Sequence, residues 1–160
     1  MDRRLIIMRH AQSAAGTIAT ADHDRQLTDA GESEAQSVAQ QLVELGWVPQ
    51  LVLSSDARRT RETWEQMSAV FKADLPITFE EDLYLGGVTA IENALFAVDD
   101  EITDVLILGH NPGCQNAITY FSGRAERMST ANAVLLHCTS DGWSQAAQSG
   151  KFSFVQHLRP

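Results

Sequence analysis

The sequence predicts a single-domain α/β fold with a mostly parallel sheet, and three observations lead to this prediction. Short runs of Leu, Ile and Val alternate with longer stretches in which apolar residues recur at helical spacing. The chain has 160 residues, an ordinary size for one domain. No linker, internal repeat or low-complexity tract divides it. We therefore expect one domain over residues 1–160, with helices packed on a central sheet.

Six segments have the length and composition expected of strands: residues 5–9, 51–54, 77–80, 105–108, 133–137 and 152–156. Several of these are continuous apolar runs. Such runs are typical of strands that are buried on both faces of a parallel sheet. The sheet is therefore expected in the middle of the fold.

The first predicted helix lies between the first two strands. Its apolar positions recur at i, i+3, i+4, i+7 and i+10, from Ala35 to Leu45. Thr28 or Asp29 can cap its amino end, and Gly46 can close its carboxyl end.

Three further helices are expected after the second, third and fourth strands. Their apolar positions are spaced by three or four residues: Thr60, Trp64, Met67 and Phe71 in the second helix, and Ile91, Leu95 and Val98 in the third. The second helix should begin after Ser55. The fourth should begin near Pro112-Gly113, because proline favours the first turn of a helix.

Composition and charge exclude several classes of protein. The chain carries 12 Lys and Arg against 21 Asp and Glu, a formal charge of −9. This charge disfavours nucleic acid and anionic lipid as partners, and the only basic cluster is Arg58-Arg59-Arg61. No segment approaches the roughly 18 apolar residues of a membrane span. We expect no membrane association.

The amino-terminal apolar stretch, residues 5–8, is too short for a secretory signal. We therefore expect a cytoplasmic protein. Cys114 and Cys138 should then be free thiols in the core. No spacing of His or Cys residues indicates a metal site, and we expect neither a metal nor a cofactor.

Charged and imidazole side chains follow three of the predicted strands. Arg9 and His10 end the first strand, and His110 follows the fourth. Arg59 lies one turn into the helix that follows the second strand. Because ligands of open α/β sheets bind at the carboxyl ends of the strands, these four side chains should converge on one pocket. Two guanidinium groups and two imidazoles are typical of a site for phosphate or another anion.

Three motifs resemble those of the histidine phosphatase superfamily. Arg9-His10-Ala11 resembles its Arg-His-Gly signature, and residues 55–63 resemble its second motif, in which the functional arginine stands four positions after the serine. Gly109-His110-Asn111-Pro112-Gly113 resembles the form of the Gly-His signature found in small phosphohistidine phosphatases of the SixA type. Residues 24–28, followed by Gly31, also resemble that branch. The resemblance covers almost the whole chain.

The resemblance implies a three-layer α/β/α fold of the phosphoglycerate-mutase-like kind. It also implies a metal-independent phosphatase in which His10 attacks phosphorus and forms a covalent phosphohistidine, while Arg9, Arg59 and His110 hold the phosphoryl oxygens. A backbone carbonyl should hold the other ring nitrogen of His10 as a donor.

Ser13 and Asn111 could supply further hydrogen bonds to the phosphate. The substrate implied by the resemblance is phosphohistidine in a protein.

The chain departs from the superfamily pattern in two places. Ala11 replaces the usual glycine, and no glutamate matches the general acid that many members carry after the third strand. Asp82 is the best-spaced substitute for this acid. A site without an acid favours cleavage of a P–N bond, because a protonated imidazole leaves readily whereas an alkoxide does not.

Two other functions remain open at this stage. An effective acid at Asp82 would favour a phosphatase for small phosphoesters. A pocket without turnover would make the protein a phosphate-recognising binding module.

Overall fold

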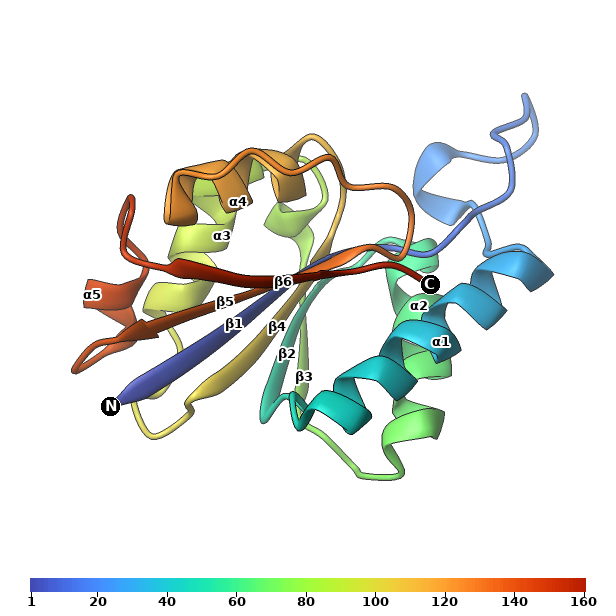
Figure 1. The fold of residues 1–160 in the computed structure, drawn as a ribbon. Coiled ribbons are helices and arrows are strands. Elements are labelled where there is room, and N and C mark those ends of the chain that lie inside the picture. The colour runs from blue at the N-terminus through green and yellow to red at the C-terminus, as the bar shows by residue number, and fades with distance from the viewer.

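The computed structural model covers residues 1–160 and has an α/β fold in three layers. A six-stranded sheet lies between two groups of helices, which cover its opposite faces (Figure 1). The predicted fold class is confirmed.

The strands agree with the six predicted segments and extend most of them at one or both ends. They are β1 (Asp2–Arg9), β2 (Leu51–Ser55), β3 (Ile77–Glu80), β4 (Asp104–Gly109), β5 (Ala133–Thr139) and β6 (Ser153–Leu158). Their order in the sheet is β3-β2-β4-β1-β5-β6. The first four strands in this order pair in parallel, whereas β5 runs antiparallel to β1 and to β6. The carboxyl ends of β2, β4 and β1 therefore lie side by side.

The four predicted helices are present, and the structure adds three short helical turns. The helices are α1 (Asp29–Leu45), α2 (Arg58–Phe71), α3 (Gly87–Phe96), α4 (Gly113–Ser122) and α5 (Trp143–Ala146), and the 3-10 turns are η1 (Asp22–Asp24) and η2 (Glu81–Leu83). The sequence did not predict α5, η1 or η2, because segments of three or four residues are too short to show a helical period.

The caps predicted for α1 are confirmed. The hydroxyl oxygen of Thr28 accepts a hydrogen bond from the backbone N–H of Gly31 at 3.0 Å. Gly46 ends the helix with φ of 71°, a left-handed conformation that glycine adopts without steric cost. The prediction for α3 is wrong at its end: the helix stops at Phe96, so Val98 follows it. Val98 is nevertheless buried, with 8% of its surface exposed.

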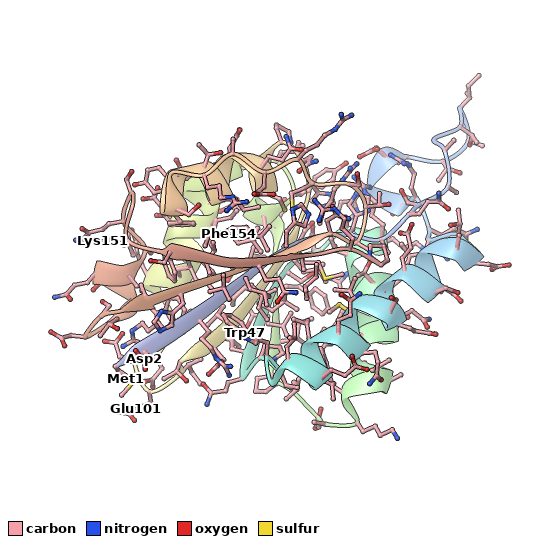
Figure 2. All side chains as sticks on the ribbon, viewed as in Figure 1. Met1, Asp2, Trp47, Glu101, Lys151 and Phe154 are labelled. Carbon is pink, nitrogen blue, oxygen red and sulfur yellow. The ribbon has the colours of Figure 1, made fainter.

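Two apolar clusters form the core, one on each face of the sheet. Leu5 and Ile7 of β1 belong to the cluster under α3 and α4, whereas Ile6 and Met8 belong to the cluster under α1 and α2. This division follows from the alternation of side chains along a strand. Figure 2 shows side chains filling the space on both sides of the sheet. Both faces of the central strands are thus buried, as their continuous apolar runs predict.

Both cysteines are buried free thiols, as predicted. None of the helices combines the length and the apolar character needed to cross a membrane.

Candidate active site

The carboxyl ends of β1, β2 and β4 surround a polar cavity of about 290 Å³. Nine residues line it, and none of them is hydrophobic: Arg9, His10, Gln12, Ser13, Arg25, Arg59, His110, Asn111 and Thr130. Six of the seven side chains singled out in the sequence therefore meet here. Their convergence follows from the parallel pairing of the strands that precede them.

His10 lies at the base of this cavity, with 6% of its surface exposed. Its Nδ1 is 2.7 Å from the backbone oxygen of Ala11. A carbonyl can only accept, so Nδ1 carries the proton and Nε2 carries the lone pair. Burial, together with the positive charges of Arg59 and Arg9, lowers the pKa of His10 from 6.5 to about 4. At neutral pH the ring is therefore an uncharged base whose lone pair is on Nε2.

Ala11 fits without backbone strain at the position where the superfamily has glycine. Its φ is not positive, since the only non-glycine residues with positive φ are Lys72 and Ala131. Its methyl group is fully buried, and its N–H donates to the hydroxyl of Thr63 at 3.0 Å. The alanine therefore does not disturb the loop that carries His10.

Arg59 is buried against His10, with 6% of its surface exposed. Its Nε donates to Nε2 of His10 at 3.3 Å. Its other nitrogens donate to the backbone oxygen of Asp22 at 2.8 Å and to the carboxylate of Asp22 at 3.2 Å. This guanidinium thus occupies the side of His10 that an incoming phosphoryl group would need.

Arg58 and Arg61, the other arginines of this cluster, make their contacts outside the cavity. Arg58 forms an ion pair with Glu62 at 2.7 Å. Arg61 donates to the backbone oxygen of Asp56 and packs its guanidinium on the ring of Phe79. The choice of Arg59 from the motif spacing agrees with this geometry.

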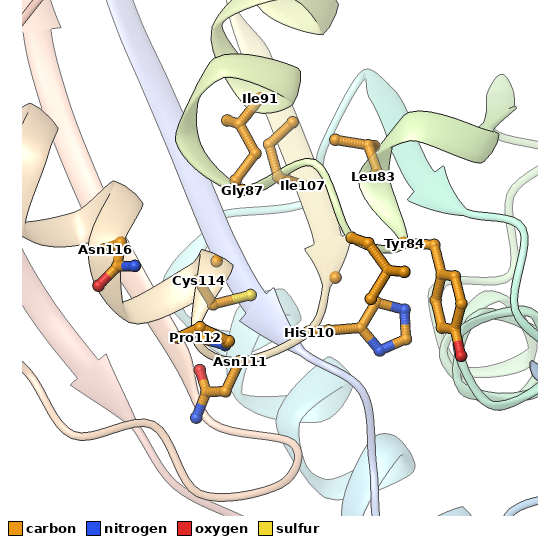
Figure 3. Close-up of a pocket in the computed structure, with 13 residues that line it drawn as sticks. Leu83, Tyr84, Gly87, Ile91, Ile107, His110, Asn111, Pro112, Cys114 and Asn116 are labelled. Atoms are coloured by element: carbon orange, nitrogen blue, oxygen red, sulfur yellow. The ribbon is translucent and has the colours of Figure 1, made fainter. Parts of the chain in front are cut away.

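His110 faces His10 across the cavity, with 5.2 Å between the ring centroids. Its Nε2 lies 2.8 Å from the hydroxyl of Ser55, while its buried Nδ1 has no partner. Burial, and then the charges of His10 and Arg59, lower the pKa of His110 from 6.5 to about 3. Figure 3 shows its ring beside that of Tyr84, and the two rings meet edge to face.

Arg9, the last residue of β1, is the second arginine predicted for the site. Its Nη1 donates to the backbone oxygen of Met128 at 3.1 Å, and its buried Nε has no partner. Together Arg9, Arg25 and Arg59 place three cations around one cavity. The amino end of α4, which follows His110 closely in the chain, adds partial positive charge at the same edge of the sheet.

Ser13 and Asn111 line the cavity, and both are hydrogen-bonded to groups of the protein. The hydroxyl of Ser13 accepts from Arg25 at 2.9 Å. The amide nitrogen of Asn111 donates to the backbone oxygen of Met128 at 2.7 Å and to the side chain of Gln115 at 3.2 Å. The amide nitrogen of Asn111 is therefore engaged by oxygens of the protein, and this residue holds the segment around Met128 against the cavity.

Asp82, the seventh side chain, does not line this cavity. Asp82 belongs to η2, is exposed, and lines a separate cavity of about 500 Å³ that shares no residue with the one around His10. The short turn of η2 directs the chain so that Tyr84, two positions later, approaches the site instead.

The carboxylate that contacts the arginines is Asp22, which the sequence did not single out. Its oxygens accept hydrogen bonds from Arg25 at 2.9 Å, from Arg59 and from the hydroxyl of Tyr84. The Tyr84 hydroxyl, and then Arg25, hold the pKa of Asp22 well below its usual range, and Asp22 in turn raises the pKa of Tyr84. Asp22 is therefore ionised at neutral pH.

Arg25 also lines the cavity and was not singled out from the sequence. It lies in residues 24–28, a segment that resembles the superfamily, so this position could have identified it as a site residue. Asp22 and Tyr84 carried no comparable signal, because they are far apart in the chain and meet only after folding.

No group of three or more His, Cys, Asp or Glu side chains is arranged to hold a metal ion. A buried, uncharged imidazole, surrounded by arginines at the strand ends of an α/β sheet, defines a class of protein that handles anions such as phosphate. The profile of the histidine phosphatase superfamily (branch 1) matches residues 5–84. The chain belongs to this superfamily.

Two curated relatives span most of the chain. A chloroplastic protein of Arabidopsis thaliana is 38% identical over 155 residues, which cover 91% of this chain and 71% of the plant protein. A protein of Mycobacterium leprae is 28% identical over 160 residues and covers 94% of this chain and 91% of its own length.

Solved structures match the fold throughout. A protein of Nakamurella multipartitia that carries the assignment of phosphohistidine phosphatase SixA is 25% identical, with a TM-score of 0.85 over 100% of this chain and 97% of that one. The protein histidine phosphatase SixA complexed with tungstate is 21% identical, with a TM-score of 0.83 over 98% of this chain and 96% of that one. The similarity to the tungstate complex shows that the two proteins share a fold.

Proposed function

We propose that this protein is a metal-independent phosphatase that works through a covalent phosphohistidine on His10 and acts on phosphohistidine in a protein. The observation that carries the proposal is the hydrogen bond from Nδ1 of His10 to the Ala11 carbonyl, which leaves the lone pair on Nε2 inside a cavity lined by arginines. A neutral imidazole held in this way is a ready nucleophile.

In the first step, the lone pair of His10 Nε2 forms a bond to phosphorus as the bond from phosphorus to the leaving group breaks. Arg59 exchanges its hydrogen bond to Nε2 for hydrogen bonds to phosphoryl oxygens. Arg9 and His110 contribute donors that have no partner in the free protein. Positioned donors of this kind stabilise the charge of the transferring group.

In the second step, water attacks phosphorus and the electron pair of the N–P bond returns to Nε2 of His10. Nδ1 keeps its proton. Both protons of the water leave with the phosphate, which passes one of them to solvent at neutral pH. The low pKa of His10 means that the regenerated ring is again uncharged.

The absence of a suitable acid supports phosphohistidine as the substrate. Asp82 lies outside the cavity, and Asp22 is kept ionised by Tyr84 and Arg25. An ionised carboxylate cannot protonate an alkoxide in the transition state, whereas the ring of a phosphohistidine that already carries a proton departs neutral. A phosphorylated protein is therefore the partner that this chemistry favours.

Trapping of the phosphoenzyme tests the mechanism. The unsubstituted protein, quenched during turnover of a phosphohistidine protein, should carry phosphate that is labile to acid and stable to alkali, and His10→Ala should carry none. Acid-stable phosphate, or no covalent phosphate with measurable turnover, would contradict the mechanism. Binding of phosphate without any turnover would instead favour a binding module.

A leaving-group series tests the substrate class. Without an acid, turnover should fall steeply from nitrophenyl phosphate to alkyl phosphates, while phosphohistidine stays a good substrate. Asp82→Asn should change none of these rates. If alkyl phosphates are hydrolysed as fast as nitrophenyl phosphate, and Asp82→Asn selectively removes that activity, the protein is a phosphatase for small phosphoesters.

A further inference from the structure

The hydroxyl of Ser55 makes a buried contact with His110. Ser55 is the last residue of β2 and is fully buried, and its oxygen lies 2.8 Å from Nε2 of His110. Because β2 and β4 pair in parallel up to Ser54 and Leu108, the serine and the histidine that follow stand at neighbouring strand ends. The contact is therefore set by the sheet itself.

The hydrogen bonds around Ser55 determine where its proton goes. The hydroxyl oxygen already accepts from the N–H of Ala57 at 3.2 Å. The backbone oxygen of Ser55 accepts from the hydroxyls of Ser54 and Thr60. Nε2 of His110 is the only acceptor in hydrogen-bonding contact with the Ser55 hydroxyl. A buried hydroxyl that finds no acceptor costs free energy, so Ser55 donates to Nε2.

We propose that Ser55 is a positioning residue that holds His110 in the tautomer with its proton on Nδ1. The unpartnered Nδ1–H can then donate to a phosphoryl oxygen. The opposite tautomer would turn a nitrogen lone pair towards that oxygen and weaken binding of the transition state. The part of this inference that concerns phosphoryl transfer rests on the proposed function, whereas the tautomer assignment does not.

The two histidines of the cavity thus carry their proton on the same ring nitrogen for opposite purposes. In His10 the Ala11 carbonyl accepts a hydrogen bond from Nδ1–H, so that Nε2 presents a lone pair. In His110 the Ser55 hydroxyl donates a hydrogen bond to the lone pair of Nε2, so that Nδ1 presents a proton. Since His110 is uncharged, it has one ring proton only, and its location decides whether the ring repels or attracts an anion.

Nitrogen-15 NMR of the histidine rings tests the tautomer directly. In the unsubstituted protein at neutral pH, His110 should show a protonated Nδ1 and an unprotonated Nε2. In Ser55→Ala the two tautomers should become mixed. A protonated Nε2 in the unsubstituted protein, or two protonated nitrogens, would overturn the assignment whether or not the protein is a phosphatase.

Kinetics test the consequence for phosphoryl transfer. Ser55→Ala should lower kcat for nitrophenyl phosphate by about 10- to 100-fold, with a smaller effect on KM, as expected when the group that orients a charge-stabilising donor is lost. Ser55→Thr should restore most of the activity because it keeps the hydroxyl.

The matched control is Ser54→Ala, which removes a buried hydroxyl that bonds only to the backbone oxygen of Ser55. It should leave both the kcat and the His110 signals near their original values. Equal losses in the two alanine variants, or a Ser55→Ala enzyme as active as the original, would overturn the positioning role. Failure of the unsubstituted protein to turn over any phosphorylated compound would contradict the proposed function instead.

Discussion

Arg59 differs from the neighbouring arginines of α2 in burial and in what it touches. It contacts His10 and Asp22 inside the cavity, whereas Arg58 and Arg61 bond to groups outside it. We expect Arg59→Ala to lower kcat by about 10²- to 10³-fold, the cost of losing one charge-stabilising donor. Arg58→Ala and Arg61→Ala are the matched controls and should stay within a few-fold of the original. Equal losses in all three would show that the cluster acts through its overall charge.

The two buried histidines of the cavity should make the fold sensitive to acid. Their folded-state pKa values, about 4 for His10 and about 3 for His110, lie below the value of 6.5 expected in the unfolded chain. As pH falls below 6.5, the unfolded chain therefore takes up protons before the folded protein does. Their contribution to stability is complete above pH 6.5 and is lost progressively as pH falls towards the folded-state values.

Urea unfolding at about pH 7.5 and about pH 5 measures this linkage. The free energy of unfolding should decrease between the two pH values by less in a His10→Gln, His110→Gln double variant than in the original protein. The comparison uses the change with pH within each protein, so a general loss of stability in the variant does not affect it. An identical pH dependence in both would contradict the low pKa values.

At the scale of elements, α1 packs closely against the loop that follows β1. Gly31, in the first turn of α1, lies so close to Gln12 that a Cβ atom would collide with the backbone oxygen of Gln12. We expect Gly31→Ala to destabilise the protein by about 1–3 kcal/mol and to lower activity, because relief of the clash displaces the loop beside His10. Gly16→Ala, at an exposed position with room for a Cβ, should be nearly neutral in urea unfolding.

The turn η1 brings Asp22 to Arg59, where its carboxylate competes with a phosphoryl group for the same guanidinium. Asp22→Asn should tighten inhibition by inorganic phosphate about fivefold, since a repulsion of about 1 kcal/mol between exposed charges is removed. Asp24→Asn removes the same charge from the same turn without a contact to Arg59 and should have little effect. Weaker inhibition in Asp22→Asn would mean that Asp22 is needed to hold Arg59 in place.

At the scale of the whole molecule, positive charge is concentrated at the cavity although the net charge of the chain is negative. The chain carries a formal charge of −9, yet the cavity is lined by Arg9, Arg25 and Arg59. These cations and the amino end of α4 can balance a phosphoryl dianion by themselves. Turnover of nitrophenyl phosphate should therefore be unchanged after dialysis against EDTA. Loss of activity that Mg²⁺ or Mn²⁺ restores would contradict metal independence.

Much of the fold was predictable from the sequence, because strands and helices follow from local patterns. Length and composition predicted all six strands, and the helical spacing with Thr28 and Gly46 predicted α1 with both of its ends. The convergence of Arg9, His10, Arg59 and His110 was also predictable, since the carboxyl ends of parallel strands meet at one edge of a sheet. A residue that directly follows a strand is positioned by the backbone, whatever its side chain contacts later.

Only the tertiary structure decided which side chains touch within that edge. The contact between Asp22 and Tyr84 joins residues 62 positions apart, and the contact between Ser55 and His110 joins residues 55 positions apart. Asp82 and Asn111 had suitable sequence positions, yet a short turn places Asp82 in another cavity and the backbone around Met128 engages the amide of Asn111. Hydrogen-bond partners of this kind depend on how loops and helices pack in three dimensions, and no local pattern in the chain specifies them.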